Sequence, residues 1–493
     1  MRILIDTNIF LPLEDASSAL DSSIAELARL ASTHQHALII HPASIDDINR
    51  DSNQSRKTIN LSRVAKYQRL ENPPVLSSAE AIRLGLVAAN DNDRVDNELL
   101  FALYRNAAGL LVTEDRKIHR SAKALGLADR VHHVRQSVEF LNRVYSRTRI
   151  TLPSIKEIPL HQIDVNLPFF DSLRGDYTPF NAWFAKAAQE GRTAWVHTVD
   201  AGSLAAICIY NEEASPIVTS DDRALAGKVL KLCTLKVGEE VRGRKIGELF
   251  LKAAFRYATS NAIGKIYVTI RPGKHDLLED LCRNFGFQHF GHDKNGDGVY
   301  VKEHPVAPPT PDLPPLDYNI RFYPYFRGDS EIRKFIVPIM PTFHEMLFPE
   351  AQDQQTLFHA AVGNAIKQAY LCHARDGSIM PGDIVFFYRS HDTQAITSMG
   401  IVELVRDLDN ADQIMELVSK RTVFRREDIE VMAAKQTKVI LFRLAHHLDR
   451  PIPFNWLDLH VVKGPIQTIR RIDHDAYLRL IQERPALSRF SSH

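Results

Sequence analysis

The sequence has little cysteine, almost no net charge and no long apolar run. Its four cysteines, Cys208, Cys233, Cys282 and Cys372, are scattered and form no C-x-x-C pair. This spacing argues against a zinc site or a disulfide framework and is typical of a reducing compartment. No apolar run approaches the length that spans a bilayer, and Met1 leads directly into an apolar strand, without room for a signal peptide. These absences predict a cytoplasmic protein without a membrane partner.

The bulk composition is that of an ordinary globular protein, with 44% hydrophobic and 25% charged residues. A length of 493 residues exceeds what one hydrophobic core supports and predicts about three domains. The net charge of +1 means that any nucleic-acid-binding surface must be a local patch.

Two short apolar runs end in acidic residues. Asp6 follows Arg2–Ile5, and Asp115 follows Leu110–Val112 after two intervening residues. Asp96 lies near the start of an amphipathic helix that the apolar spacing predicts over residues 92–107. Groups at the carboxyl ends of parallel strands line the ligand-binding crevice of an open α/β sheet. Clustered carboxylates repel each other unless a cation neutralises them, and Mg²⁺ or Mn²⁺ suits oxygen ligands.

The pieces I-L-I-D-T-N, D-N-E-L-L and L-L-V-T-E-D resemble the motifs of PIN-domain nucleases, over residues 1–147. The resemblance implies an α/β domain with a parallel sheet and a metal-dependent endoribonuclease. It implies that the catalytic, metal-binding acids are Asp6, Asp47, Asp96 and Asp115. Thr113 and Asn8 are expected to position water or phosphate beside them.

Two of these acids have local alternatives. The family carries an acid on the helix after its second strand, which we place at Ala37–Ile40. We assign that role to Asp47 rather than Asp46, because Asp47 immediately precedes an apolar residue. Asp93 is the alternative to Asp96. A purely structural interpretation makes Asp6 a turn residue and Asp96 a helix N-cap.

A basic helix face follows in the same domain. Arg56, Arg63 and Lys66 share one side of a predicted helix. Such a face beside a metal site suits an RNA backbone. A solvated helix face is the structural alternative, and the sequence does not separate the two.

Residues 148–302 contain a basic loop between a predicted strand, Lys228–Val237, and a predicted helix over 246–261. Backbone N–H groups and the helix dipole at such a junction favour a phosphate. The loop V-R-G-R-K-I-G and the later N-F-G-F resemble GNAT acyltransferases, which implies an α+β domain that binds acetyl-CoA and transfers an acetyl group to an amine. The resemblance places coenzyme binding on Val237, Arg242, Gly243, Arg244, Lys245, Ile246 and Gly247.

The GNAT resemblance has two departures. Lys245 stands where the family usually has glycine. Cys282 stands where the family often has a tyrosine that protonates the departing thiolate. A strand-to-helix turn without a ligand is the structural alternative for the loop.

The segment 303–317 is rich in proline and predicts an extended linker. Beyond it, residues 318–493 contain short strands closed by turns, which predict a small β-barrel. P-G-D-I-V-F-F-Y and A-I-T-S-M-G-I-V-E resemble PUA-like domains of the ASCH and EVE type. That class implies binding of RNA or modified bases.

Basic and aromatic residues in this C-terminal part suit RNA. Lys420, Arg421, Arg425 and Arg426 interleave with an aromatic residue, as phosphate contacts and base stacking require. Tyr388, Phe424 and Trp456 are candidate stacking platforms. A basic connecting loop and aromatic core residues are the structural alternatives.

The sequence as a whole predicts a cytoplasmic, metal-dependent ribonuclease with an acetyl-CoA-binding domain and an RNA-binding domain. The sequence does not specify whether the RNA partner is tRNA, a modified RNA or another RNA. Two alternatives concern the central domain: an N-acetyltransferase acting on an RNA-linked or protein amine, or an acyl-CoA sensor that gates the nuclease.

Overall fold

The computed structural model describes residues 1–14, 21–145, 154–177, 179–199, 202–238, 241, 245–273, 275–348, 360–362, 365–374, 378–419, 421 and 424–492. The chain forms two compact units. The first joins Met1–Ile150 to Asp407–Thr437, and the second joins Thr151–Arg406 to Lys438–His493. Each unit therefore combines stretches that are far apart in the sequence. In the described part of the chain no helix has the length and apolar character needed to cross a membrane.

The first unit is built on a parallel five-stranded sheet in the order β3-β2-β1-β4-β5. Its strands are β1 (Arg2–Ile5), β2 (Ala37–Ile40), β3 (Gln68–Arg69), β4 (Leu110–Val112) and β5 (Val131–His132). Leu4 and Leu111 belong to one hydrophobic core, and the alternate residues Ile3 and Val112 are also fully buried. Because successive strand residues point to opposite faces, both faces of this sheet are covered.

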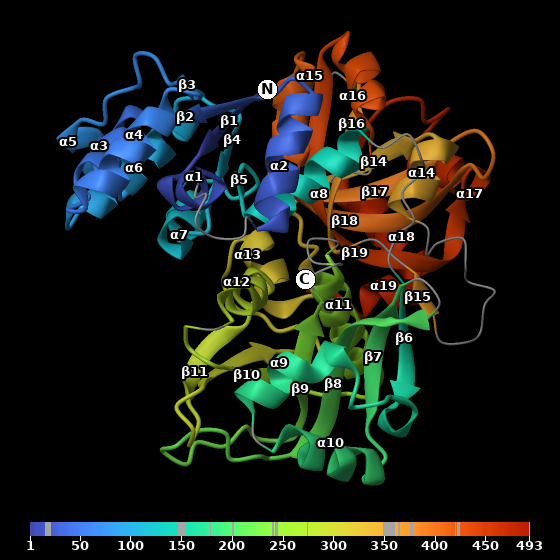
Figure 1. The fold of residues 1–493 in the computed structure, drawn as a ribbon. Coiled ribbons are helices and arrows are strands. Elements are labelled where there is room, and N and C mark those ends of the chain that lie inside the picture. The colour runs from blue at the N-terminus through green and yellow to red at the C-terminus, as the bar shows by residue number, and fades with distance from the viewer. Residues whose placement is uncertain are drawn as a thin grey trace. The chain divides into compact units, whose positions relative to one another are not determined.

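Helices supply the two covering layers. In Figure 1 the strands of this sheet lie between α2 and α8 on one side and α3 and α6 on the other. The helices from the N-terminal stretch are α1 (Thr7–Glu14), α2 (Ser22–Thr33), α3 (Pro42–Asn49), α4 (Gln54–Val64), α5 (Ser78–Leu84), α6 (Asp91–Tyr104), α7 (Arg116–Ala124) and α8 (Val134–Tyr145). The later stretch adds α15 (Ala411–Val418) and α16 (Arg426–Ala433), which pack against each other.

The second unit contains a central mixed sheet of eight strands in the order β11-β12-β10-β9-β8-β7-β6-β15. The strands are β6 (Ser154–Pro159), β7 (Thr193–Thr198), β8 (Leu204–Ala214), β9 (Lys228–Val237), β10 (Lys265–Ile270), β11 (Gln288–His292), β12 (Gly298–Glu303) and β15 (Ala360–Val362). In Figure 1 the labels β11, β10, β9, β8, β7, β6 and β15 follow this order. Among these described strands β9 and β10 are the one parallel pair, and β15 extends the sheet from a distant part of the chain.

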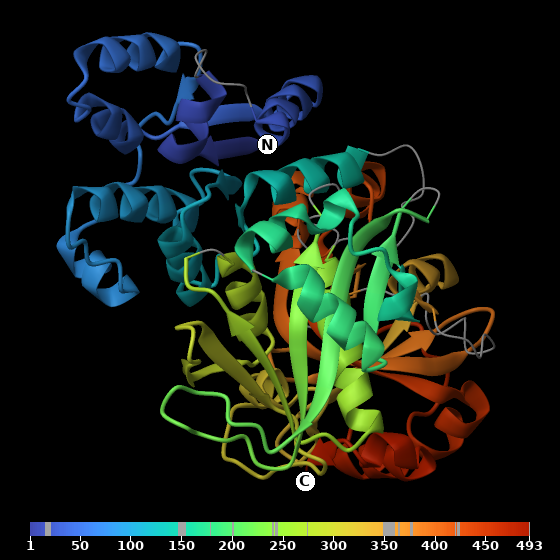
Figure 2. The ribbon, with the colours of Figure 1, turned by 60° about the horizontal axis from the view of Figure 1, so that its bottom comes forward.

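Two groups of helices cover the central sheet. α9 (Asp171–Asp176) and α10 (Phe180–Gln189), with the short 3₁₀ turns Leu160–Gln162 and Pro168–Phe170, pack on one face, as Figure 2 shows. α11 (Ile246–Ser260) and α12 (Asp276–Asn284) pack on the other face.

A second mixed sheet completes this unit, in the order β16-β19-β18-β17-β14-β20. Its strands are β14 (Lys334–Ile339), β16 (Lys367–Cys372), β17 (Ile384–Arg389), β18 (Ala395–Leu408), β19 (Thr437–Pro453) and β20 (Arg470–Ile472). Within the described strands, β16 and β20 end the order and do not pair with each other. The described pairing is therefore an open sheet and not the closed barrel that the short strands predict.

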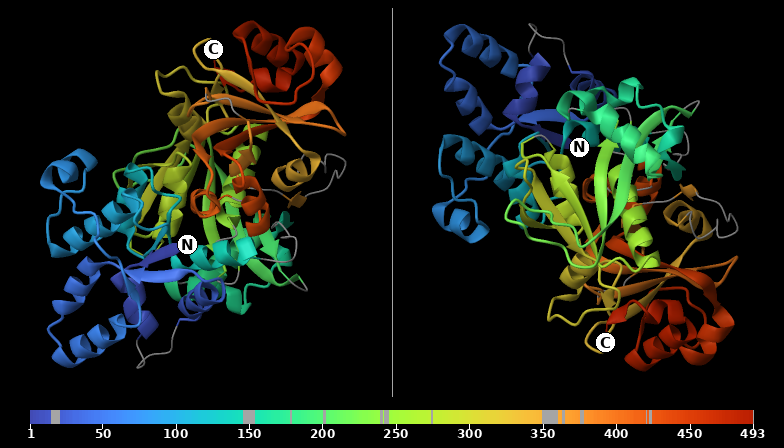
Figure 3. Two further views of the ribbon diagram at one scale, coloured as in Figure 1. Left: turned by 90° about the horizontal axis from the view of Figure 1, so that it is seen from above. Right: turned by 90° about the horizontal axis from the view of Figure 1, so that it is seen from below.

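Helices and a small strand pair surround this C-terminal sheet. α17 (Phe454–His460), α18 (His474–Glu483) and α19 (Pro485–Ser488) share its core, and Figure 3 shows them in red beside the orange strands. α13 (Pro315–Phe322), α14 (Pro341–Leu347) and the parallel pair β13 (Phe326–Arg327) and β21 (Ser491–Ser492) complete it. The proline-rich segment is held by hydrogen bonds: Tyr318 Oη donates to the Pro309 carbonyl at 2.8 Å, and Arg327 Nη1 donates to that of Leu313 at 2.9 Å.

Candidate functional sites

The carboxyl edge of the parallel sheet holds a group of acids around Asp6. Asp6 directly follows β1 and is 5% exposed. Its Oδ2 accepts hydrogen bonds from Thr113 Oγ1 at 2.6 Å and from Asn8 Nδ2 at 2.7 Å. Its Oδ1 accepts the N–H of Thr7 at 2.6 Å. Thr113 and Asn8 thus fix the orientation of this carboxyl group.

The other three acids act electrostatically on this position or on each other. The pKa of Asp6 is raised to about 6, chiefly by burial and also by the charges of Asp115 and Asp47, against the opposing hydrogen bonds from Thr113 and Thr7. Burial likewise raises the pKa of half-buried Asp96 to about 7, with contributions from the charges of Asp115 and Asp6. The structure thus gathers the four predicted acids into one electrostatic group, and strongly shifted acids are frequent at functional sites.

The structure also distinguishes Asp93 from Asp96, the two alternatives for the acid on α6. Asp93 accepts the N–H of Ala89 at 3.0 Å and forms an ion pair with Lys117, which lowers the pKa of Asp93. Asp93 is therefore engaged within the fold, whereas the pKa of Asp96 is raised.

The fit of a metal ion to these acids is limited. Across the described residues, no group of three or more His, Cys, Asp or Glu side chains has a geometry that could hold a metal ion. Asp115 Oδ1 caps α7 by accepting the N–H of Lys117 at 2.7 Å, and Asp47 pairs with Arg50 at 2.6 Å. Mg²⁺ is often bound by only one or two carboxylates together with waters. The donor chemistry fits such a water-rich site and does not form a cage of protein ligands.

The basic helix face has internal partners. Arg56 pairs with Asp51, Arg63 donates to the Glu14 carbonyl, and Lys66 donates to Glu14 Oε2 at 2.6 Å. Arg56 and Lys66 keep 64% and 63% of their side chains exposed, so a phosphate can still approach them.

The basic C-terminal stretch is used differently from its expected role. Lys420 lies outside the described residues. Arg421 is 6% exposed in its side chain and pairs with Asp129, while Arg426 pairs with Asp412 and Glu430, each at 2.6 Å. Arg425 contacts Asp428 at 3.5 Å. Carboxylates of the protein therefore occupy the positions that phosphates were expected to take.

The expected stacking platforms are mostly interior. Tyr388 and Phe424 are 4% and 0% exposed, so neither presents a ring face to an RNA base. Trp456 is partly buried against the core of the C-terminal sheet. For Tyr388 and Phe424 the prediction of stacking is wrong, because Tyr388 lies in β17 and Phe424 lies between α15 and α16, and both rings are buried.

The loop that the sequence predicts to bind coenzyme begins where two parallel strands part. β9 pairs with β10 from Val229 to Leu232, yet β9 continues to Val237. The pairing of β9 with β8 shifts register between Ile209 and Tyr210, and this shift leaves Cys233 as the extra residue of a bulge. Beyond Leu232, β9 therefore presents backbone N–H and C=O groups that β10 does not bind.

The far side of the loop is the start of α11. Lys245 has a left-handed backbone with φ of +57° and directly precedes Ile246, the first residue of the helix. A Cβ at Gly247 would lie 2.8 Å from Leu281 Cδ2, so a larger residue there would displace the Leu281 side chain. Arg242, Gly243 and Arg244 lie outside the described residues.

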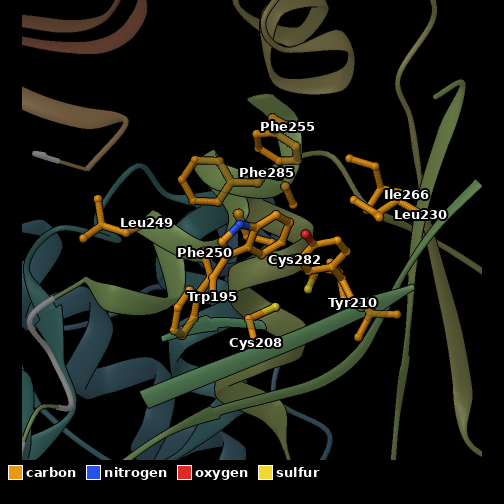
Figure 4. Close-up of a cluster of buried hydrophobic side chains, with 14 of the residues drawn as sticks. Trp195, Cys208, Tyr210, Leu230, Leu249, Phe250, Phe255, Ile266, Cys282 and Phe285 are labelled. Atoms are coloured by element: carbon orange, nitrogen blue, oxygen red, sulfur yellow. The ribbon is translucent and has the colours of Figure 1, made fainter. Parts of the chain in front are cut away.

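Cys282 is not an acid for acetyl transfer in this structure. Figure 4 shows its thiol among buried side chains that include Phe250, Phe255 and Phe285. Cys282 is 0% exposed, and burial raises the pKa of its thiol. Such a neutral, enclosed thiol cannot deliver a proton to a ligand.

The sequence gives no sign of one further residue at this site. Glu248, in the first turn of α11, is 7% exposed and accepts the N–H of Lys367 at 2.7 Å. An acid in the first turn of a helix is common because it interacts favourably with the helix dipole. The sequence around Glu248 does not predict that Lys367 is its partner.

Comparisons with known proteins give partial likenesses only. No protein-family model and no curated protein matches this chain. Solved structures that resemble part of it include the S128A mutant of ZmASCH from Zymomonas mobilis, at 10% identity and a TM-score of 0.25, covering 32% of this chain and 99% of that one. A putative GNAT-family acetyltransferase from Desulfovibrio desulfuricans matches at 15% identity and a TM-score of 0.25, with 30% and 97% covered. The PaiA N-acetyltransferase from Thermoplasma acidophilum, solved with coenzyme A, matches at 14% identity and a TM-score of 0.23, with 30% and 99% covered.

Proposed function

We propose that the central sheet binds an acyl-coenzyme A between β9 and the start of α11 and transfers its acyl group to an amine. The observation that carries this proposal is the parting of β9 from β10 beyond Leu232. Extended ligands with amide groups bind exposed strand edges by adding to the ladder of backbone hydrogen bonds. The two amides of the pantetheine arm match the edge that β9 offers.

The pyrophosphate of the coenzyme suits the start of the neighbouring helix, α11. A helix N-terminus binds phosphate through free N–H groups and its dipole, and the loop before α11 carries Arg242, Arg244 and Lys245. The sequence and the backbone thus support a pyrophosphate at one end and a thioester between the parted strands.

The test is a transfer assay with the full chain. Radiolabelled acetyl-CoA is incubated with separate acceptors: total RNA, aminoacylated tRNA and protein. Label on one acceptor class supports acyl transfer and names the substrate class. Tight binding without transfer leaves an acyl-CoA sensor, and absence of both contradicts the proposal.

A second candidate function rests on the acids at the edge of the parallel sheet. We propose that Asp6, Asp47, Asp96 and Asp115 support hydrolysis of RNA phosphodiester bonds. The observation that favours it is the raised pKa of Asp6 and of Asp96, and the charge of Asp6 contributes to the shift of Asp96. A Mg²⁺ or Mn²⁺ ion held by one or two of these carboxylates would supply a water of lowered pKa.

Cleavage of total RNA tests the second function. The full chain is incubated with RNA and Mn²⁺, and the cleaved ends are mapped. Asp96→Asn should abolish cleavage, and the exposed Asp91→Asn on the same helix serves as control. Equal cleavage by wild type and Asp96→Asn would contradict the assignment.

A further inference from the structure

The start of α11 is joined to the edge strand of the C-terminal sheet through a single residue, Lys367. Glu248 Oε1 accepts the N–H of Lys367 at 2.7 Å, and Lys245 Nζ donates to its carbonyl at 3.2 Å. Both backbone polar groups of Lys367 are therefore bound by side chains at the start of α11.

The geometry of β16 explains why these groups are accessible to α11. Among the described strands, β16 ends the order and pairs with β19, where Leu444 N–H donates to the Ile366 carbonyl at 2.7 Å. Successive residues of a strand point their backbone groups in opposite directions, so those of Lys367 face away from β19. An edge strand leaves such groups unpaired unless another element covers them, and α11 covers them here.

Buried charges hold the junction in place. Glu403 on β18 lies 3.6 Å from Lys367 Nζ and accepts Arg443 Nη1 at 3.2 Å. Arg443 is 0% exposed and also donates to Asn319 Oδ1 at 3.2 Å. Its guanidinium lies 4.9 Å from the ring centre of Phe285, at the end of α12. The C-terminal sheet thus contacts the beginning of α11 and the end of α12.

The orientation of Glu248 matters for a phosphate ligand. A carboxylate in the first turn of a helix competes with phosphate for the free N–H groups and repels it. The hydrogen bond to Lys367 holds this carboxylate against β16. The same hydrogen bond anchors the first turn of α11 to the C-terminal sheet.

We propose that Glu248 and Lys367 are positioning residues through which the C-terminal sheet sets the affinity of the coenzyme site. The inference rests on the proposed binding of acyl-CoA at α11. It makes the C-terminal sheet a part of that site, so a change in β16 alters coenzyme binding without touching the coenzyme.

The experiment compares full-length variants by calorimetric titration with acetyl-CoA. Glu248→Ala should weaken binding by about tenfold, because it releases the start of α11 from β16, and this loss outweighs the removal of the carboxylate's repulsion of phosphate. Glu248→Gln should rescue binding, because its amide oxygen still accepts the N–H. Glu190→Ala, a carboxylate that pairs with Arg192 beyond α10, is the control and should bind as wild type does.

A substitution pair at Lys367 tests the same contact from the other side. Lys367→Pro removes the donating N–H, and Lys367→Ala keeps it while removing the charge. Only the proline variant should lose affinity, and hydrogen exchange along β16 should slow when acetyl-CoA binds to wild type. If wild type binds acetyl-CoA and both Glu248→Ala and Lys367→Pro bind it with the same affinity, the inference is overturned but the proposed function is not. Absence of binding to wild type would overturn the proposed function and the inference with it.

Discussion

Arg421 and Asp129 form a two-pronged ion pair although 292 residues separate them in the chain. Arg421 Nε lies 3.2 Å from Asp129 Oδ1, and Nη2 lies 3.0 Å from Oδ2. His132 Nε2 and Ser419 Oγ make a further contact at 2.8 Å beside this pair. The stretch 407–437 therefore packs on the amino ends of the parallel strands, opposite the acids at their carboxyl ends.

Breaking this ion pair should destabilise the first unit. Arg421→Met leaves Asp129 without its cation in a largely buried setting, and loss of one partner of such a pair costs about 3 kcal/mol. Differential scanning calorimetry should show a lower melting temperature. Arg425→Met is the matched control, because Arg425 is 40% exposed and pairs within its own helical turn. Equal melting of both variants would show that the ion pair does not hold the stretch.

The raised pKa of Asp96 predicts a pH-dependent stability. Asp96 shifts from an ordinary value of 3.8 to about 7, so the folded chain holds this proton more tightly than the unfolded chain. Stability from this group is fully present below pH 4 and is lost as the pH rises through about 7. Asp96→Asn should therefore melt like wild type near pH 4 and at a higher temperature above pH 7. A melting difference that does not grow with pH would contradict the raised pKa.

Cation binding should act on the same group. If Mn²⁺ is held at the acid group, it should raise the melting temperature of wild type above pH 7, where Asp96 is ionised. The shift should be absent in Asp96→Asn and should persist in Asp91→Asn. A shift of equal size in all three proteins would place the cation elsewhere.

Cys282 should be dispensable for the coenzyme. Cys282→Ala should bind acetyl-CoA with wild-type affinity and transfer acetyl at the wild-type rate, because the thiol lies in the core. Cys282→Ser should lower the free energy of unfolding by about 1–3 kcal/mol, since it buries a hydroxyl among apolar side chains. Chemical denaturation and the transfer assay measure the two effects. A slower acetyl transfer by Cys282→Ala with intact binding would show that Cys282 takes part in the reaction.

Local patterns in the sequence were enough to place the strands that carry the candidate sites. The apolar runs at Leu110–Val112, Lys228–Val237 and Lys265–Ile270 coincide with β4, β9 and β10. Asp6 and Asp115 lie beside each other because both follow strands of one parallel sheet. Strand-end acids can thus be grouped once the sheet is known to be parallel.

Long-range packing explains the predictions that the sequence could not support. The cations of 420–426 are typical of an RNA-binding loop, but the acid that pairs with Arg421 is Asp129, 292 residues earlier in the chain. β15 pairs with β6, and the N–H of Lys367 binds Glu248 on α11. No local sequence pattern predicts either of these contacts. Periodicity identifies which face of an element is apolar, and it does not identify the segment that covers that face.

The most direct measurement of the central proposal is a titration of the full-length chain with acetyl-CoA, in wild type and in Gly243→Asp. Wild type should bind, and a hundredfold excess over the dissociation constant should stabilise the fold by about 2.7 kcal/mol. Gly243→Asp should lose both the binding heat and the stabilisation, because it places a side chain and a negative charge in the loop before α11. Full binding by Gly243→Asp, or no binding by wild type, would contradict a coenzyme site between β9 and α11.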